Sequence, residues 1–194
     1  MARESHKQKL LTEGLRVVHE RGYGGASVRD IVAAAGVPHG SFTNHFASKE
    51  AFGLEVLDLY YARVQDVVLK TLRNDELPPM KRLRGYIDDV LRQTAKGGAR
   101  RGCVFGNFSA EAVEGNEVIR KRLVEILDEL QGSIEYCLKA AVKAGELSAA
   151  TKTRELAGFI LSSLQGAILF SKAYRSVASI ERFKKILLAS IATG

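Results

Sequence analysis

Residues 27–46, SVRDIVAAAGVPHGSFTNHF, form the stretch that decides the fold. Ser27 can cap the start of a helix, and Asp30 three residues later completes a capping-box pattern. A helix of about two turns is unstable by itself, so this one has to pack against others. The apolar residues that recur at helical spacing on its single apolar face are Val28, Ile31, Val32 and Ala35.

A turn and a second short helix follow. Gly36 tolerates the positive φ of a helix end, and Pro38 suits the first turn of a new helix. In this second helix Phe42 and Phe46 share one face. The polar side and its flanks consist of His39, Gly40, Ser41, Thr43 and Asn44. A helix-turn-helix needs this division, because its second helix buries one side and offers hydrogen-bonding groups to bases and phosphates in the major groove.

Other polar residues near this stretch are candidates for DNA contacts. His39, in the first turn of the second helix, is the histidine that we expect to touch DNA. His45, next to Phe46, fits a packing or capping role better than a base contact. Ser48 and Lys49 begin the next expected helix, where free backbone N–H groups and a positive side chain favour a phosphate contact. A solvated lysine is the alternative for Lys49.

The composition and charge of the chain bound its class. With 194 residues and an ordinary globular composition, the chain can bury a sizeable core. The formal net charge of +7 favours polyanionic partners, although many proteins of similar charge never meet nucleic acid. The charged N-terminus, and the polar residues that interrupt the hydrophobic stretch 159–170, argue against export and membrane spanning. The expected compartment is the cytosol.

The sequence lacks the patterns of an enzyme or a metalloprotein. Cys103 and Cys137 are the only cysteines and have no zinc-site spacing, so neither a disulfide framework nor a metal site is expected. The glycine-rich segment 96–102, KGGARRG, follows a helix and contains no phosphate-binding loop motif. Without a nucleophile elbow, a metal cluster or a dinucleotide fingerprint, we predict no enzymatic activity and no cofactor.

The rest of the chain shows helical periodicity and no credible strand, so we predict an all-α fold. Gly158, Ser162 and Gly166 recur at four-residue spacing and would let another helix approach closely, so we predict a dimer interface there. Phe183 and Leu187 lie at helical spacing on the last helix and are further interface candidates. The other expected helices cover residues 5–21, from 48 onward, 80–94, 103–112, 117–144, 153–174 and 180–191.

The stretch GYGGASVRDIVAAAGVPHGSFTNHFASKEAF resembles the N-terminal domain of TetR-family transcriptional regulators. The resemblance implies a homodimeric repressor with an N-terminal DNA-binding domain of three helices in residues 1–47. It also implies that residues 48–194 bind a small effector and form the dimer through the last two long helices. Ser27 would contact phosphate, residues 38–45 would be the recognition helix, and Lys49 would contact the DNA backbone.

One position departs from the family pattern. The family usually has an aromatic residue, often Tyr, where this chain has Thr43. The usual tyrosine contact to DNA is therefore absent, and Thr43 can instead meet a thymine methyl group or a phosphate.

The segment 102–111, GCVFGNFSAE, resembles the same region in the TetR branch that includes AcuR and NemR, repressors that sense acrylate and electrophiles. Cys103 follows Arg100 and Arg101 and stands at an expected helix start, and both features favour the reactive thiolate. A sensor thiol is one interpretation, and a small buried hydrophobic side chain is the other. The further candidates for the effector pocket are Phe105, Asn107 and Glu111.

Together these patterns predict a ligand-responsive DNA-binding repressor. Its partners would be double-stranded operator DNA, a small effector and a second copy of the chain. The operator would be palindromic, because a two-fold dimer presents its two recognition helices to major grooves about 34 Å apart. The alternative is a helical architectural nucleic-acid-binding protein that needs no effector.

Overall fold

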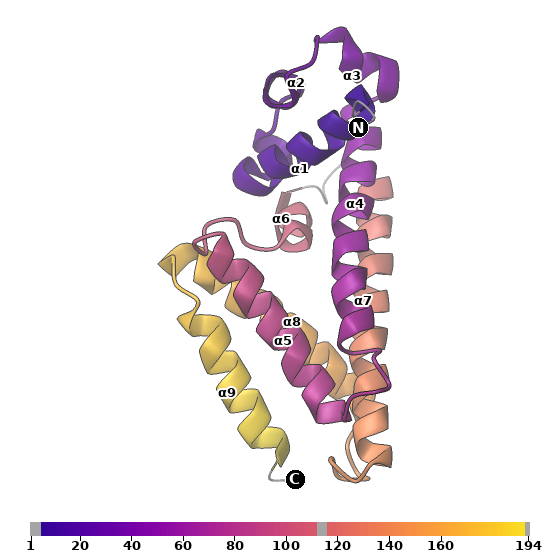
Figure 1. Ribbon diagram of the computed structural model, residues 1–194, viewed down its shortest axis with the longest axis vertical. Coiled ribbons are helices and arrows are strands. Elements are labelled where there is room, and N and C mark those ends of the chain that lie inside the picture. Colours follow the sequence, from indigo (N-terminus) through magenta and orange to yellow (C-terminus); the bar gives the residue numbers. More distant parts are fainter. Residues whose placement is uncertain (1–4, 112–115, 193–194) are drawn as a thin grey trace. The chain divides into compact units, whose positions relative to one another are not determined.

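The computed structural model describes residues 5–111 and 116–192, and these residues form helices and no strand (Figure 1). The prediction of an all-α fold is confirmed, with small differences at the helix ends. Ala112, the expected end of one short helix, lies outside the described residues. The helices are α1 (His6–Gly25), α2 (Val28–Ala35), α3 (Gly40–His45), α4 (Lys49–Lys70), α5 (Pro79–Lys96), α6 (Val104–Glu111), α7 (Glu117–Lys143), α8 (Thr153–Tyr174) and α9 (Ala178–Ala192).

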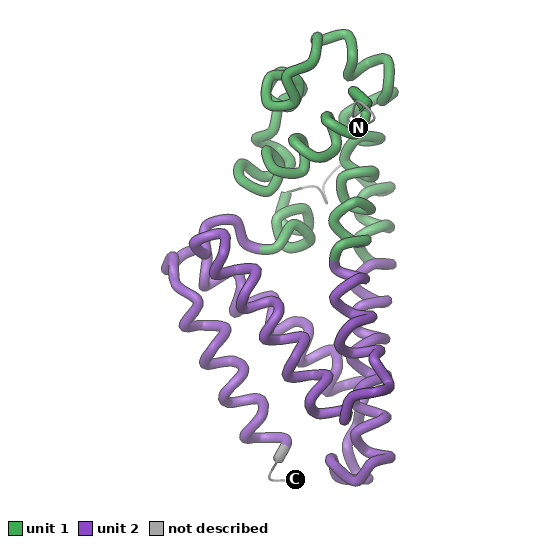
Figure 2. Tube along the Cα trace, viewed as in Figure 1, with its two compact units in different colours: residues 1–63, 103–124 green, residues 64–102, 125–194 purple. Residues whose placement is uncertain are grey.

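The chain divides into two compact units (Figure 2). Unit 1 contains residues 1–63 and 103–124, and unit 2 contains residues 64–102 and 125–194. The divisions at 63/64 and 124/125 fall inside α4 and α7, so each of these helices belongs partly to both units. Unit 1 thus combines the three N-terminal helices, which end at His45, with α6, which begins only at Val104.

Helix α1 extends beyond its expected end. Ser5 caps its start, because the Ser5 hydroxyl accepts a hydrogen bond from Gln8 N–H at 3.2 Å. Gly22 has φ 81°, a value that glycine adopts at little cost, and it interrupts the helical geometry. The helix then resumes as far as Gly25. The first, regular part of α1 thus ends at Arg21, as the sequence predicts, and a short segment continues the helix beyond the kink.

The expected start and end of α2 are both present. Asp30 N–H donates to Ser27 Oγ at 3.1 Å, and Ser27 N–H donates to Asp30 Oδ2 at 3.1 Å, which completes the capping box. The Ser27 hydrogen bonds lower the pKa of the Asp30 carboxyl, with a smaller contribution from Arg21. Gly36 ends the helix in the left-handed conformation at φ 61°. These local contacts fix both ends of α2, and α3 begins four residues after Gly36, at Gly40.

Three phenylalanines form the core beneath α3. Phe42 and Phe46 are each 3% exposed, and Phe52 of α4 is 0% exposed. Their ring centroids lie 5.1–5.3 Å apart. Gly14 of α1 completes the packing, because a Cβ at this position would lie only 2.3 Å from Phe52 Cζ. The aromatic cluster Phe42–Phe46–Phe52 therefore joins α3 and α4. Helix α1 packs closely against this cluster at Gly14.

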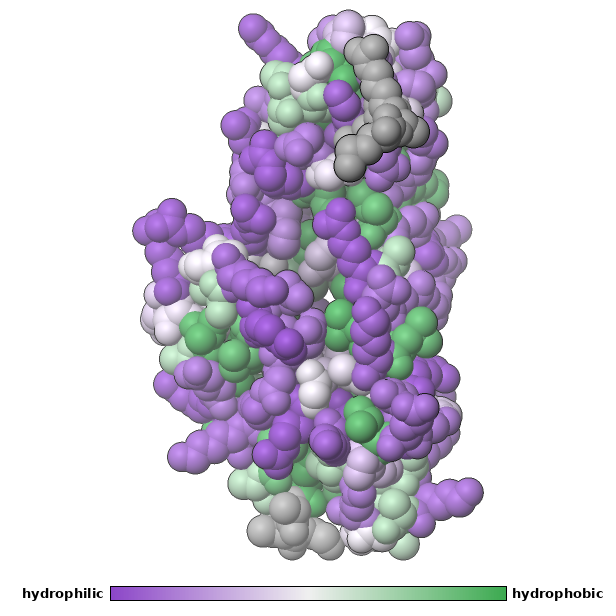
Figure 3. Space-filling model, viewed as in Figure 1, coloured by the Kyte–Doolittle hydropathy of each residue, from purple (hydrophilic) through white to green (hydrophobic). Residues whose placement is uncertain are grey.

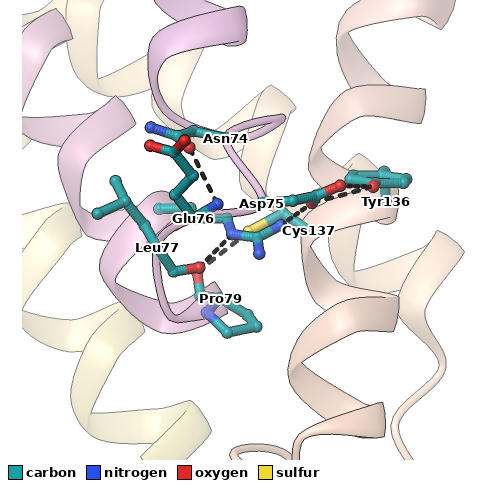
Figure 4. Close-up of polar contacts among 8 residues, drawn as sticks. Asn74, Asp75, Glu76, Leu77, Pro79, Tyr136 and Cys137 are labelled. Carbon is teal, nitrogen blue, oxygen red and sulfur yellow. Dashed lines mark hydrogen bonds and ion pairs between the residues drawn. The ribbon is translucent and has the colours of Figure 1, made fainter.

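A polar cluster in unit 2 fastens the α4–α5 connection to α7 (Figure 4). Arg82, which is 6% exposed, donates from Nε to Leu77 O at 2.6 Å and pairs with Asp75 Oδ1 at 2.5 Å. Tyr136 of α7 donates to Asp75 Oδ2 at 2.8 Å, and this hydrogen bond is the main reason that the pKa of Asp75 is lowered. Cys137 donates to Pro79 O at 3.2 Å, and burial raises its pKa to about 11.

Apolar side chains are also present on the surface. On the face drawn in Figure 3, hydrophobic residues reach the surface in separate patches within hydrophilic surroundings. Among the described helices, Thr153–Tyr174 (α8) is long and apolar enough to cross a membrane, by length and composition alone. Only 39% of that apolar window is buried in the protein. Long packed helices of globular proteins have the same length and composition, so these two properties do not distinguish a membrane span from a packed helix.

Candidate functional site

The polar side of α3 forms an exposed surface above the aromatic cluster. His39 occupies the N-cap position of α3 and makes no side-chain capping bond. Thr43 Oγ1 donates to Gly40 O at 3.1 Å, so its methyl group is the part free to meet an apolar group. The exposed residues of this surface, which we call the α3 surface, are Pro38, His39, Gly40, Thr43, Asn44 and His45.

Two residues of α3 lie differently from the sequence interpretation. Ser41, expected at the flank of the DNA-facing side, is 7% exposed, and its Oγ lies 3.1 Å from His6 Nδ1 of α1. Its hydroxyl therefore joins α3 to α1. His45, interpreted as a packing or capping residue, is exposed in the last turn of α3. Phe46 beside it takes the buried position instead.

Ser48 and Lys49 begin α4, as expected. Ser48 Oγ accepts a hydrogen bond from Ala51 N–H at 3.0 Å, which caps the helix. Lys49 Nζ lies 4.8 Å from the centroid of the Tyr23 ring and donates to Gly24 O at 3.4 Å. Burial lowers the pKa of Lys49, and the nearby Glu111 carboxylate opposes that shift. The ammonium is therefore held against the end of α1 and does not extend freely into solvent.

The start of α2 contributes Ser27, whose side chain is exposed but engaged. Its hydroxyl donates to Asp30 Oδ2 at 2.5 Å within the capping box. Arg21, which the sequence interpretation did not single out, pairs with Asp30 Oδ1 at 2.7 Å and is exposed. A positively charged side chain directly before a helix-turn-helix could have marked Arg21 as a candidate for a DNA contact.

The four effector-site candidates occupy the start and length of α6. Cys103 is half-buried directly before the helix, and its carbonyl accepts from Asn107 N–H at 3.0 Å. Phe105 is 1% exposed, and its ring lies 4.9 Å from the Tyr60 ring of α4. Asn107 is 9% exposed. The Glu111 carboxylate faces α1, where Oε2 accepts from Gly24 N–H at 2.8 Å.

The small residues of α8 differ in their surroundings. Ser162 is exposed, and its hydroxyl donates to Phe159 O of its own helix. A Cβ at Gly166 would meet nothing within 4 Å, so this position is open. A Cβ at Gly158 would lie 3.4 Å from Gln131 Nε2 of α7, so this glycine is partly covered within unit 2.

The candidates on α9, Phe183 and Leu187, share one side of the helix but differ in burial. Phe183 is half-buried. Leu187 is 4% exposed and packs inside unit 2, whereas its neighbour Ile186 is 58% exposed. Helical spacing thus identified the side of α9 that packs within the chain. Leu187 is covered there within its own chain, so it is a poor candidate for a dimer contact.

Comparisons with known proteins identify the family. Residues 10–56 match the family described as "Bacterial regulatory proteins, tetR family". Residues 79–187 match the "Tetracyclin repressor-like, C-terminal domain". The chain belongs to the TetR family. It is therefore a DNA-binding transcription regulator with an N-terminal helix-turn-helix, and TetR-family proteins are regulatory proteins and not enzymes.

The relatives include named TetR-family repressors. The HTH-type transcriptional repressor DhaR of Mycobacterium sp. (strain GP1) is 36% identical over 191 residues, which is 98% of this chain and 94% of DhaR. The transcriptional regulator AcuR of Cereibacter sphaeroides is 34% identical, over 85% of this chain and 75% of AcuR. The reduced form of Escherichia coli NemR has a TM-score of 0.86 and 25% identity, with 95% of each chain covered. The resemblance to the AcuR and NemR branch is thus confirmed.

Among the described residues, no group of three or more His, Cys, Asp or Glu side chains could hold a metal ion.

Proposed function

We propose that the chain is a homodimeric TetR-family repressor that leaves a palindromic operator when a small electrophile reacts with it. Residues 1–47 would contact DNA, and residues 48–194 would bind the effector and form the dimer. The observation that carries the proposal is the exposed polar side of α3, mounted on an aromatic cluster that fixes its orientation. Such a rigid, polar helix surface is what major-groove recognition requires.

The proposed DNA contacts divide into two kinds. The α3 surface supplies base contacts, in which Asn44 can pair with adenine and Thr43 can meet a thymine methyl group. Ser27, Ser48 and Lys49 would bind the phosphate backbone on either side of α3. Ser41 has a supporting role, since its hydroxyl lies against His6.

Exposed apolar side chains on α8 support a dimer through α8 and α9. Phe159, Leu169, Phe170 and Tyr174 are each between 56% and 69% exposed. Phe170 and Tyr174 stack with their ring centroids 6.0 Å apart. Ile186 of α9 is also 58% exposed, and large apolar side chains exposed on neighbouring helices are a feature of protein interfaces.

The small residues Gly158, Ser162 and Gly166 would allow a partner helix to approach α8 closely, and Phe183 would lie at the edge of that contact. Such packing would place α8 in a protein interface of a cytoplasmic regulator, not in a membrane.

The position of Cys103 supports an electrophile as the effector. The thiol is half-buried at the start of α6, whereas the Cys137 thiol is buried and has a pKa of about 11. In the proposed reaction the Cys103 sulfur forms a bond to the β-carbon of an acrylate-like or quinone compound. The π electrons of the carbon–carbon double bond move toward the carbonyl group, and the thiol proton ends on the resulting enolate. Phe105 and Asn107 would line the space that admits the compound.

A binding experiment separates this function from an effector-independent architectural role. DNA fragments retained by the purified protein from its own genome would define a candidate operator. Labelled operator and scrambled duplexes would then be titrated at two salt concentrations. We expect the operator to bind at least about a thousandfold more tightly than the scrambled duplex at physiological salt. Equal affinity with a steep salt dependence would favour the architectural protein instead.

Lys49→Ala tests the phosphate contact. If the ammonium binds one phosphate, the variant should bind operator and scrambled duplexes more weakly to a similar degree. The slope of log K against log salt concentration should become shallower by about one unit. Lys70→Ala is the matched control, because Lys70 is exposed at the far end of the same helix. An unchanged slope in the Lys49 variant would remove this residue from the interface.

A further inference from the structure

The end of α1, the start of α4 and the end of α6 meet at one point of unit 1. Tyr23 of α1 is 7% exposed, and its ring lies 4.9 Å from the Phe108 ring of α6. On another side it packs against α4, where a Cβ at Gly53 would lie 2.7 Å from Tyr23 Cε2. Lys49 Nζ lies over the same ring. The side chain of Tyr23 is therefore held between α4 and α6, and the Lys49 ammonium lies over its ring.

The Glu111 carboxylate completes this contact point. Its Oε2 accepts a hydrogen bond from Gly24 N–H at 2.8 Å, while the carbonyl of the same Gly24 accepts from Lys49 Nζ at 3.4 Å. A Cβ at Gly22 would lie 2.1 Å from Glu111 Oε1, so the carboxylate occupies the space that a side chain there would fill. Gly22 also has a positive φ of 81°. One residue of α1, Gly24, thus contacts both the negative charge of α6 and the positive charge of α4.

We propose that Glu111 is a positioning residue for operator binding, which fixes the Gly22–Gly25 segment and thereby holds the Lys49 ammonium in the orientation that meets a DNA phosphate. The inference rests on the proposed function, because it assigns a purpose to the Lys49 contact. A lysine side chain has many rotamers, and restricting them before binding reduces the entropy lost in the complex. The attraction between the Glu111 carboxylate and Lys49 adds to the two contacts that Lys49 makes with Tyr23 and Gly24.

This assignment differs from the sequence interpretation of Glu111 as part of an effector pocket. It also gives α6 a direct connection to a DNA contact. Cys103 lies at the start of α6 and Glu111 at its end. A displacement of this short helix would withdraw the carboxylate from Gly24 and release Lys49. The same residue would thereby transmit a change at Cys103 to the operator contact.

The test is a double-mutant cycle on operator affinity. Glu111→Ala should weaken operator binding roughly tenfold, the size expected for loss of a hydrogen bond to a charged group. Glu111→Gln keeps an acceptor for Gly24 N–H and should lose less. In a Lys49→Ala background, Glu111→Ala should have little further effect, because its action depends on Lys49. Fully additive losses would overturn the proposal and leave Glu111 with a purely structural role.

Glu117→Ala is the control for the loss of one carboxylate from the same unit, because Glu117 is paired with Arg120 at 2.6 Å. It should bind operator like the parent protein. An equal tenfold loss in this variant would also overturn the proposal.

A second measurement on the free protein does not require DNA. Lysine side chains labelled with ¹³C-methyl groups would show Lys49 shifted upfield by the Tyr23 ring, and Lys49→Arg would assign that signal. In Glu111→Ala the shift should collapse toward the value of an exposed lysine. An unchanged shift would refute the positioning role. If the parent protein binds no duplex specifically, the proposed function fails, while this measurement still decides whether Glu111 orients Lys49.

Discussion

Phe52→Ala should destabilise the protein by about 3–5 kcal/mol, the cost of removing a fully buried phenylalanine from a packed core. Phe52 is 0% exposed and contacts both Phe42 and Phe46, and Gly14 is close enough that a Cβ there would lie 2.3 Å from the Phe52 ring. Alanine would leave a cavity beneath α3, and helices this short cannot remain ordered without their packing. The midpoint of urea unfolding, followed by circular dichroism at fixed protein concentration, measures the loss.

The matched control is Leu69→Ala on the same helix. Leu69 is 63% exposed, so its truncation should change stability by no more than about 0.5 kcal/mol. Amide hydrogen exchange adds a local test, because the loss of protection in Phe52→Ala should include α3 and the neighbouring part of α1. A variant as stable as Leu69→Ala, with α3 still protected, would show that the aromatic cluster does not hold α3.

The features that sequence alone predicted well are those determined by near neighbours in the chain. The capping box of Ser27 and Asp30 needs residues three apart, and the left-handed Gly36 needs only itself. The burial of Phe42 and Phe46 follows from their shared face on a helix. These local signals place the helix-turn-helix, so the family could be predicted from a fraction of the chain, whereas the all-α fold followed from helical periodicity along the rest of it.

The features that the sequence did not predict depend on partners far along the chain. Ser41 resembles the other polar residues of α3, but it is buried and its hydroxyl contacts His6 of α1, 35 residues away. Glu111 is an ordinary exposed acid until α6 packs on α1 and places it against Gly24, 87 residues away. Three glycines at positions 22, 24 and 25 were a signal of close approach by another group, but they did not identify it.

Cys103→Ser should abolish release from the operator by acrylate-like or quinone compounds and leave operator affinity unchanged. Serine is nearly isosteric, and its hydroxyl is not ionised at neutral pH, so the conjugate addition to the electrophile would not occur. Fluorescence anisotropy of a labelled operator would measure affinity and release in the same titration. Intact-mass spectrometry should show one adduct on each chain of the parent protein and none on the variant.

Cys137→Ser provides the matched control for the loss of a thiol. The Cys137 side chain is 1% exposed, donates to Pro79 O, and has its pKa raised by burial to about 11, so its thiolate is scarce at neutral pH. This variant should form the adduct and leave the operator as the parent protein does. Release that persists in Cys103→Ser without an adduct would show that the effector binds reversibly. Cys103 would then be a packing residue at the start of α6. Any displacement of α6 that moves Glu111 would in that case be caused by a ligand that forms no covalent bond.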